Sequence, residues 1–162
     1  MFFRQGIMGA PIDIIQNLSE ITADMIIDVR SPAEFAKDHI PGAINMPVLN
    51  NEERAEVGRI YKQINAFQAR RYGSALVAGN ISQHILNHLQ NKPAEFRPLI
   101  YCWRGGQRSH SFARICSDIG WRTYVLKGGY KSYRKNVLIG LETEALQIKP
   151  ILISGPTGTG KT

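Results

Sequence analysis

Residues 101–110 of the sequence read YCWRGGQRSH, and this stretch decides the fold prediction. It follows the apolar segment PLIYC (98–102), which is typical of a buried strand, and leads into SFARICSDIG (111–120), which is typical of a helix that stops at a glycine. Gly105 and Gly106 let the intervening loop curl so that several backbone N–H groups point inward. The stretch therefore predicts a strand, an anion-binding loop and a helix in succession.

The flanking sequence continues this alternation of strands and helices. MIIDVR (25–30) predicts a strand, and a helix follows because Ser31 can cap it, Pro32 suits its first turn and Glu34 completes a capping box. Such alternation predicts an α/β fold with a mainly parallel sheet that is flanked by helices on both faces. The further elements expected are a turn at Pro41–Gly42 with a brief strand in HIPGAINMP (39–47), a strand and tight turn in TYVLKGG (123–129), a helix over 130–147 and a strand in PILISG (150–155).

Residues 50–92 are polar and compatible with helix, and they predict a helical insertion between strands. We expect this insertion to break near Gly73 and again at Gly79–Asn80. In the later helix, the spacing places Phe112, Cys116 and Ile119 on one side.

Cys102 stands where its thiol would ionise easily. The N-terminus of the following helix and the neighbouring Arg104 and Arg108 favour the thiolate, which is the form that attacks electrophiles. Cys102 and Arg108 form the pattern C-x5-R, which lets a cysteine attack a tetrahedral oxyanion whose oxygens the arginine and the loop N–H groups hold. The pattern predicts a nucleophile inside an anion cradle.

The distribution of charge also predicts an anionic ligand. The net charge is +7, and residues 97–135 hold nine Lys or Arg but one acid, Asp118. Such a cluster attracts an anion or a nucleic-acid backbone, while a solvated basic face stays the alternative. No segment approaches the roughly 18 apolar residues of a membrane-spanning helix, and the opening MFFRQG lacks the pattern of a secretory signal. We therefore expect a soluble cytoplasmic protein that does not associate with membranes.

Several other residues have simpler interpretations. Cys116 is expected to be a core thiol, with a resolving cysteine as the alternative. His84 and His88 have the spacing of metal ligands, but no third ligand is near in sequence, so we expect surface histidines and no metal site. The roles of His110, as an acid or a hydrogen-bond donor, and of Trp103, as a stacking platform or a packing group, stay open.

Residues 155–162, GPTGTGKT, match a phosphate-binding loop after a predicted strand. In such a loop backbone N–H groups surround phosphates, Lys161 neutralises charge and Thr162 can hold Mg²⁺. Because the helix that completes such a site would follow Thr162, we expect a first domain over residues 1–148 and the truncated start of a second α/β domain over 149–162. The glycines expected in this loop are Gly155, Gly158 and Gly160.

The segment IIDVRSPAEFAKDHIPGAINMP (26–47), followed by the cysteine loop and GGY (128–130), resembles a rhodanese domain. That fold is shared by sulfurtransferases and by one class of dual-specificity phosphatases. The resemblance implies that Asp28 and Arg30 are mainly structural. Ordinary sulfurtransferases of the family have a six-residue active loop, whereas residues 102–108 make seven, as in the phosphatases, so the resemblance implies a substrate larger than a bare sulfur atom.

The pairing of such a domain with a phosphate-binding loop, together with NNEERAEVGRIYKQ (50–63) and GGYKSYR (128–134), resembles the tRNA 2-selenouridine synthase family. The resemblance covers about residues 26–162. It implies that selenium from selenophosphate replaces the sulfur of S-geranylated 2-thiouridine at the wobble position of tRNA. Geranyl diphosphate would be a second substrate, an enzyme that supplies selenophosphate would be a partner, and no cofactor would be tightly bound.

The same resemblance assigns roles to residues. Cys102 would be the selenium-carrying or selenium-accepting nucleophile. The oxyanion cradle would comprise Trp103, Arg104, Gly105, Gly106, Gln107, Arg108 and Ser109. Phosphate, from the diphosphate donor, would bind to Gly155, Gly158, Gly160, Lys161 and Thr162. The phosphates of tRNA would contact Arg122, Lys127, Lys131, Arg134 and Lys135.

Three alternatives stay open beside the selenium transferase: a cysteine phosphatase on the same fold, a thiosulfate sulfurtransferase, and a rhodanese module without catalysis that docks tRNA or a protein partner. The phosphatase alternative leaves the phosphate-binding loop unexplained, and Asp118 is poorly placed as its acid.

Overall fold

A computed structural model describes residues 9–145 together with Ser154 and Gly158. Its centre is a sheet of five parallel strands in the order β1-β5-β4-β2-β3. The register places Asp28 beside Tyr101, so that β2 and β4 end at the same edge of the sheet. The predicted parallel α/β sheet is confirmed. The strands are β1 (Ile12–Ile15), β2 (Met25–Asp28), β3 (Ile44–Asn45), β4 (Pro98–Tyr101) and β5 (Thr123–Leu126).

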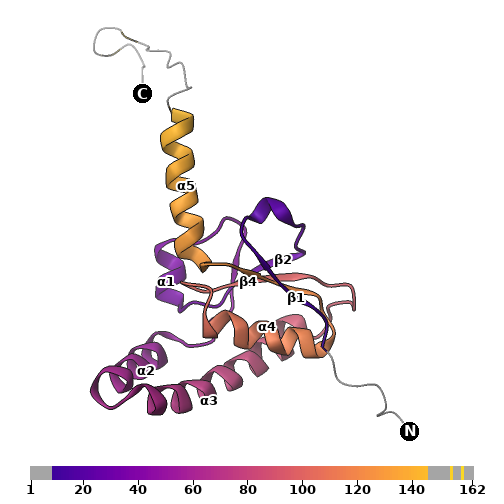
Figure 1. Cartoon of the computed structure of the whole chain (residues 1–162), viewed down its shortest axis with the longest axis vertical. Helices are drawn as coiled ribbons and strands as arrows, with labels where there is room; N and C mark the ends of the chain where they lie inside the picture. The colour runs from indigo at the N-terminus through magenta and orange to yellow at the C-terminus, as the bar shows by residue number, and fades with distance from the viewer. Residues whose placement is uncertain (1–8, 146–153, 155–157, 159–162) are drawn as a thin grey trace.

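Helices cover both faces of this sheet (Figure 1). Along β4 the side chains alternate, because Ile100 packs into one apolar cluster with Phe112 of α4, whereas Leu99 packs into another with Tyr130 of α5. Both clusters are buried, which fixes the sheet between its two helical layers. The helices are the 3-10 turn η1 (Leu18–Glu20), α1 (Pro32–Lys37), α2 (Asn51–Gln63), α3 (Ala66–His84), the π-helical turn η2 (Ile85–Leu89), α4 (Gln107–Ile119) and α5 (Gly129–Ala145).

The capped helix predicted after β2 is confirmed as α1. The Glu34 carboxylate accepts hydrogen bonds from the backbone N–H of Ser31 at 3.2 Å and from its hydroxyl at 3.3 Å. The predicted turn is also present, since Gly42 has a φ of +78°.

The helical insertion is confirmed, but its predicted breaks are wrong. Helix α3 runs unbroken through Gly73 and Gly79, and the chain instead turns between α2 and α3, where the side chain of Asn65 accepts a hydrogen bond from the N–H of Gln68 at 2.8 Å. At Gly73 the two helices pack closely, because an added Cβ would lie 3.3 Å from both methyl groups of Val57. Gly73 thus serves the contact between α2 and α3 rather than a break.

The structure differs from the sequence-based expectations at two further points. Strand β1 was not expected from the sequence, and it pairs with β5 at the edge of the sheet. Ile119 is 47% exposed at the end of α4, so the buried side of that helix is formed by Ser109, Phe112, Ala113, Cys116 and Ser117. The helix does stop at a glycine, Gly120, whose φ is +112°.

Apart from Ser154, which has no regular secondary structure, the predicted strand at 150–155 lies outside the described residues. Most of the predicted phosphate-binding loop, including Gly155, Gly160, Lys161 and Thr162, also lies outside them. Gly158 is exposed with a φ of +89°. Among the residues that were searched, no helix combines the length and apolar character needed to cross a bilayer.

Candidate active site at the cysteine loop

Cys102 directly follows β4, and the loop after it leads into the N-terminus of α4. The start of α5 closes the loop from the other side, because the N–H of Tyr130 donates to the carbonyl of Cys102 at 2.9 Å and the N–H of Lys131 donates to that of Trp103 at 3.0 Å. This approach requires glycine at position 129, where φ is +60° and an added Cβ would collide with the Cys102 carbonyl oxygen. Backbone contacts with two helices therefore hold the loop in shape.

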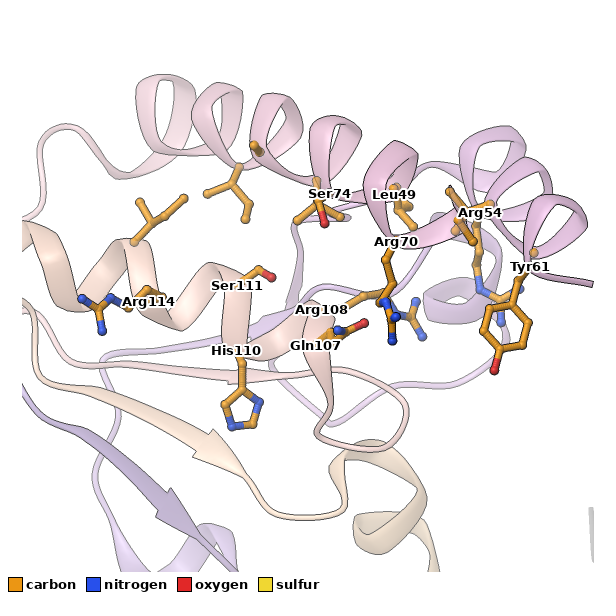
Figure 2. Close-up of a pocket in the computed structure, with 18 residues that line it drawn as sticks. Leu49, Arg54, Tyr61, Arg70, Ser74, Gln107, Arg108, His110, Ser111 and Arg114 are labelled. Carbon is orange, nitrogen blue, oxygen red and sulfur yellow. The ribbon is translucent and has the colours of Figure 1, made fainter. Parts of the chain in front are cut away.

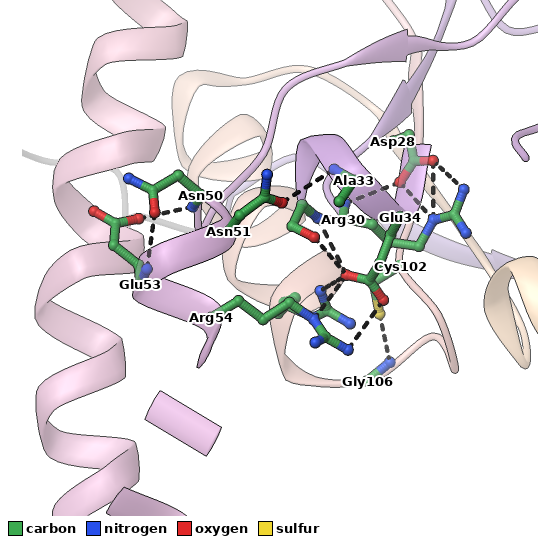
Figure 3. A network of polar contacts seen from close by, with 12 residues as sticks. Asp28, Arg30, Ala33, Glu34, Asn50, Asn51, Glu53, Arg54, Cys102 and Gly106 are labelled. Carbon is green, nitrogen blue, oxygen red and sulfur yellow. Dashed lines mark hydrogen bonds and ion pairs between the residues drawn. The ribbon is translucent and has the colours of Figure 1, made fainter. Parts of the chain in front are cut away.

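Cys102 is 3% exposed, and hydrogen-bond donors surround its sulfur. The N–H of Gly106 donates to Sγ at 3.2 Å (Figure 3). The Ser109 hydroxyl lies 3.4 Å from Sγ. Burial acts to raise the pKa of the Cys102 thiol, but hydrogen bonds from the Ser109 hydroxyl and from the N–H groups of Ser109, Arg104 and Gly106 outweigh it, so the pKa is lowered. The loop therefore stabilises the thiolate through its dipoles, as the glycines and the helix start predicted.

The two arginines of the loop take a different position from the one expected. Arg108 is paired with Glu34 of α1 at 3.0 Å, and Arg54 of α2 binds the same carboxylate at 2.8 Å. Burial raises the pKa of Glu34, but the hydrogen bond and charge of Arg108 and the further contacts with Ser31 and Arg54 lower it overall. The side chain of Arg104 is exposed. In this structure Arg108 is thus held by Glu34, a partner 74 residues away that the sequence did not indicate.

Asp28 and Arg30 of the DVR segment lie next to residues that hold the cysteine loop. Asp28 and Arg30 are 0% and 1% exposed and form an ion pair at 2.6 Å (Figure 3). Arg30 Nη2 also donates to the carbonyl of Asp38 at 2.7 Å. The guanidinium lies 4.1 Å from the ring centre of Tyr130, the residue whose N–H holds Cys102. Burial acts to lower the pKa of Arg30, yet Asp28 raises it overall. This arrangement agrees with a structural role for the pair.

The basic residues predicted to contact tRNA do not form one cluster. Arg122 precedes β5 and is paired with Asp13 at 2.7 Å, whereas the cysteine loop follows the opposite end of the strands. Lys127 follows β5 at the same end of the sheet as Cys102. Lys127, Lys131, Arg134 and Lys135 are all exposed on the turn after β5 or on α5.

The second cysteine and the histidines lie apart from this chemistry. Cys116 is fully buried, and burial raises its pKa to about 12, which agrees with a core thiol. His84 is half-buried rather than on the surface, since its Nε2 lies 3.0 Å from the carbonyl oxygen of Pro47 and its ring stacks on Phe112. His110 is exposed, and its Nδ1 lies 3.1 Å from the carbonyl oxygen of Gly106. Within the described ranges no three His, Cys, Asp or Glu side chains gather as metal ligands would.

Trp103 packs on the loop, with its ring centre 5.8 Å from that of Tyr130. Tyr130 was not singled out from the sequence, although it stands directly after the paired glycines. Its hydroxyl donates to the Asp38 carboxylate, and burial, with that carboxylate, raises the pKa of Tyr130 to about 12. Tyr130 thus links the cysteine loop to the residues around Arg30.

Comparisons with known proteins agree with the fold and identify the family of the chain. The sequence model of the rhodanese-like domain family matches residues 11–136. A tRNA 2-selenouridine synthase of Nitrosomonas europaea is 38% identical over 141 residues, which are 85% of this chain and 36% of that protein. A tRNA 2-selenouridine synthase of Proteus mirabilis is 41% identical over 150 residues, 91% of this chain and 41% of that protein. The chain thus spans about two fifths of the length of these curated relatives.

A solved structure of an N-terminal domain from Clostridium difficile 630 has the same fold, with a TM-score of 0.67 and 36% identity over 78% of this chain and 98% of that one. The names of the relatives confirm the resemblance to tRNA 2-selenouridine synthases that the sequence motifs indicated. Because the family model covers more than half of the residues, the chain belongs to the rhodanese-like domain family.

Proposed function

We propose that the protein is a tRNA-modifying selenium transferase, which replaces the sulfur of S-geranylated 2-thiouridine at the wobble position with selenium from selenophosphate. The observation that carries the proposal is the Cys102 sulfur, which is held in a loop of N–H donors that lower its pKa. The relatives named tRNA 2-selenouridine synthase supply the substrate class. The loop is suited to a tetrahedral anion, because its donors converge on the position of the thiolate.

Electron balance decides which atom of selenophosphate the Cys102 thiolate attacks, and it replaces the expected selenium-carrying role of Cys102 with a phosphoryl-carrying one. Attack on selenium would expel phosphite, a reduced form of phosphorus, and reoxidising it would need an oxidant. Attack on phosphorus is redox-neutral: a bond forms between Sγ and phosphorus, the bond between phosphorus and selenium breaks, and its electron pair leaves with selenium. The selenium takes a proton and is released as hydrogen selenide, while Cys102 holds the phosphoryl group whose oxygens face the N–H groups of the loop.

Hydrogen selenide then adds to C2 of the S-geranylated uridine. The bond between C2 and sulfur breaks, geranyl thiolate leaves with the electron pair, and the proton from selenium moves to N3, which yields 2-selenouridine. Water hydrolyses the phosphocysteine to inorganic phosphate and restores the Cys102 thiolate. Geranylation is needed because an alkylated sulfur leaves more easily than a thiocarbonyl sulfur. No net oxidation or reduction occurs in the cycle.

The other expectations from the sequence belong to this proposal. The segment GPTGTGKT would bind the diphosphate of geranyl diphosphate, with Mg²⁺ held at Thr162. An enzyme that makes selenophosphate would supply the substrate, and the reaction would take place in the cytoplasm. Of the predicted tRNA contacts, Lys131 lies beside the cysteine loop, since its N–H donates to the Trp103 carbonyl.

Formation of the product nucleoside tests the function. The protein is incubated without oxygen with selenophosphate and tRNA that carries S-geranyl-2-thiouridine, and the digested nucleosides are separated and weighed by mass spectrometry. We expect 2-selenouridine with the wild type and with Cys116→Ala, the matched control at the buried cysteine, but none with Cys102→Ser. Equal product from Cys102→Ser and the wild type would overturn the proposal.

The C-x5-R spacing favours one second candidate, a cysteine phosphatase, which uses the same attack on phosphorus. A phosphatase releases an alcohol, and an acid normally protonates that leaving oxygen. Asp118 does not serve as this acid, because it lies at the far end of α4 and is paired with Arg114 at 3.0 Å. Turnover of an aryl phosphate at the rate of selenophosphate would favour this candidate over the transferase.

A further inference from the structure

A groove of about 1010 Å³ lies between the pair α2 and α3 and the helix α4 (Figure 2). Much of its lining is apolar, and we call this part the floor: it includes Val57 of α2, Val77 of α3 and Ile115 of α4. The volume is at the upper end of the roughly 300–1,000 Å³ of small-molecule pockets, so the groove has room for more than one ring-sized group. It thus has the size and floor to accept extended apolar or aromatic groups.

The charged side chains that line the groove are all arginines. Four arginines, Arg54, Arg70, Arg108 and Arg114, line it together with His110, and the lining includes no Asp or Glu. The acids that pair with three of these arginines, Glu34 and Asp118, lie outside the lining, and phosphates would take their places. Residues 57–94, which form most of α2 and α3, likewise contain no acid. Arg70 projects from α3 toward α4 (Figure 2) and forms no ion pair within the described part of the chain. The partner that suits this lining is an anion with several charges.

The groove begins where the cysteine loop ends. Arg108 and Ser109 are neighbours on the first turn of α4, and Arg108 lines the groove while the Ser109 hydroxyl contacts Cys102 Sγ. Arg54 and Arg108 share the Glu34 carboxylate, which is 17% exposed. A phosphate in the groove can therefore replace Glu34 at these guanidinium groups, and a ligand in the groove ends one residue from the nucleophile's cradle.

An aromatic side chain also stands at the groove. Tyr61, near the end of α2, lines it and is 62% exposed. An exposed tyrosine among arginines is the combination that binds single-stranded nucleic acid, because bases stack on the ring while guanidinium groups bind phosphates. An acidic peptide would satisfy the arginines but would not explain a large exposed ring beside an apolar floor.

From these observations we infer that the groove between α2, α3 and α4 binds unpaired nucleotides of the substrate RNA and so delivers the reacting base to Cys102. Bases occupy the apolar floor and stack on Tyr61, and the phosphates between them contact Arg70, Arg108 and Arg114. This inference rests on the proposed function, since it assigns the substrate of that reaction to a surface of the helical insertion. Unpaired RNA is required, because only bases that are splayed out can reach the floor.

Binding of an RNA hairpin tests the inference. The probe is a fluorescein-labelled hairpin with an unpaired loop, and a fully paired duplex of equal length is the control RNA. Fluorescence anisotropy is recorded over a range of salt for the wild type, for the double variant Arg70→Ala/Arg114→Ala, and for the matched control Arg59→Ala, whose side chain is on α2 outside the groove and pairs with Glu56. For the double variant we expect binding weaker by roughly tenfold or more and a slope of log K against log salt shallower by about 1.4, which is about 0.7 for each lost phosphate contact.

The outcomes separate the inference from the function it rests on. Arg59→Ala should bind as the wild type, and Tyr61→Ala should weaken the hairpin more than the duplex. If the wild type binds the hairpin but the double variant binds with unchanged affinity and salt slope, the groove inference is wrong while the proposed function stands. If the wild type binds neither RNA at any salt, the proposed function itself fails. A 4-thiouridine in the loop should crosslink to peptides of α2 or α3, and crosslinks confined to α5 would overturn the inference.

Discussion

The Ser109 hydroxyl decides how easily the Cys102 thiol ionises, and its removal gives a quantitative test. The hydroxyl lies 3.4 Å from Cys102 Sγ and also donates to the carbonyl of Gly106 at 3.0 Å. Because a hydroxyl has one hydrogen, it donates to Gly106 while Cys102 is a thiol and turns to Sγ when the thiolate forms. Ser109→Ala removes both hydrogen bonds, so only their difference acts on the ionisation.

The size of the effect follows from the two kinds of hydrogen bond. A bond to a charged acceptor contributes about 1.5–3 kcal/mol, and a bond between neutral groups about 0.5–1.5 kcal/mol. The thiolate therefore loses about 1–1.5 kcal/mol relative to the thiol in Ser109→Ala. Since about 1.4 kcal/mol corresponds to tenfold, the thiolate fraction should fall roughly five- to twelvefold at pH values where the thiol dominates. The backbone N–H groups of Arg104, Gly106 and Ser109 remain, so reactivity is reduced rather than abolished.

The rate of alkylation by iodoacetamide, followed by intact mass, measures the thiolate of Cys102 against pH. Cys116 is buried and does not compete. We expect the alkylation profile of Ser109→Ala to move toward higher pH, while Ser82→Ala, an exposed serine on α3, keeps the wild-type profile. Equal rates for Ser109→Ala and the wild type at every pH would show that the hydroxyl does not stabilise the thiolate.

Three further predictions concern the support of the loop. Asp28→Ala leaves Arg30 buried without its counter-ion and should lower the free energy of unfolding by about 3–5 kcal/mol in urea denaturation; a loss below about 1 kcal/mol would contradict a buried pair. Gly129→Ala forces a Cβ against the Cys102 carbonyl at a φ of +60°, which distorts the loop. Alkylation of Cys102 should therefore be slower than in the wild type even where circular dichroism shows a folded protein, and an unchanged rate would refute the tight closure of the loop. Folding lowers the pKa of Glu34 below its ordinary value of 4.5. The ionised Glu34 carboxylate therefore stabilises the folded state above pH 4.5, and this stabilisation is lost as the pH falls through the lowered pKa. The unfolding free energy of the wild type should accordingly exceed that of Glu34→Gln at neutral pH and approach it in acid, and a constant difference would count against the ion pairs.

The features that the sequence predicted are those fixed by neighbouring residues. The order of strand, loop and helix around Cys102, the capped start of α1 and the glycine stop of α4 depend on residues within a few positions of one another, and the structure has all three. The chemistry of the thiol was predicted in the same way, because the N–H groups that bind Sγ belong to the loop itself.

The features that sequence reasoning missed depend on contacts between distant segments. Strand β1 has four residues and gains its partner only when β5 forms beside it. Gly73 reads as a helix breaker, but its lack of a side chain is used by Val57 in another helix. Arg108 was assigned to the oxyanion from its spacing, whereas Glu34 on α1 holds it in this structure. The groove likewise arises from the packing of α4 against the insertion, which no local pattern in the sequence describes.

The most direct test of the central claim is the mass of Cys102 after a rapid denaturing quench of the protein with selenophosphate, without oxygen and without RNA. In the first turnover, before water hydrolyses the phosphocysteine, attack on phosphorus predicts a phosphoryl group on the peptide that contains Cys102 and an equal amount of released hydrogen selenide, both absent from Cys102→Ser. A selenium atom retained on Cys102 without a phosphoryl group, or selenide released at the wild-type rate by Cys102→Ser, would contradict the account.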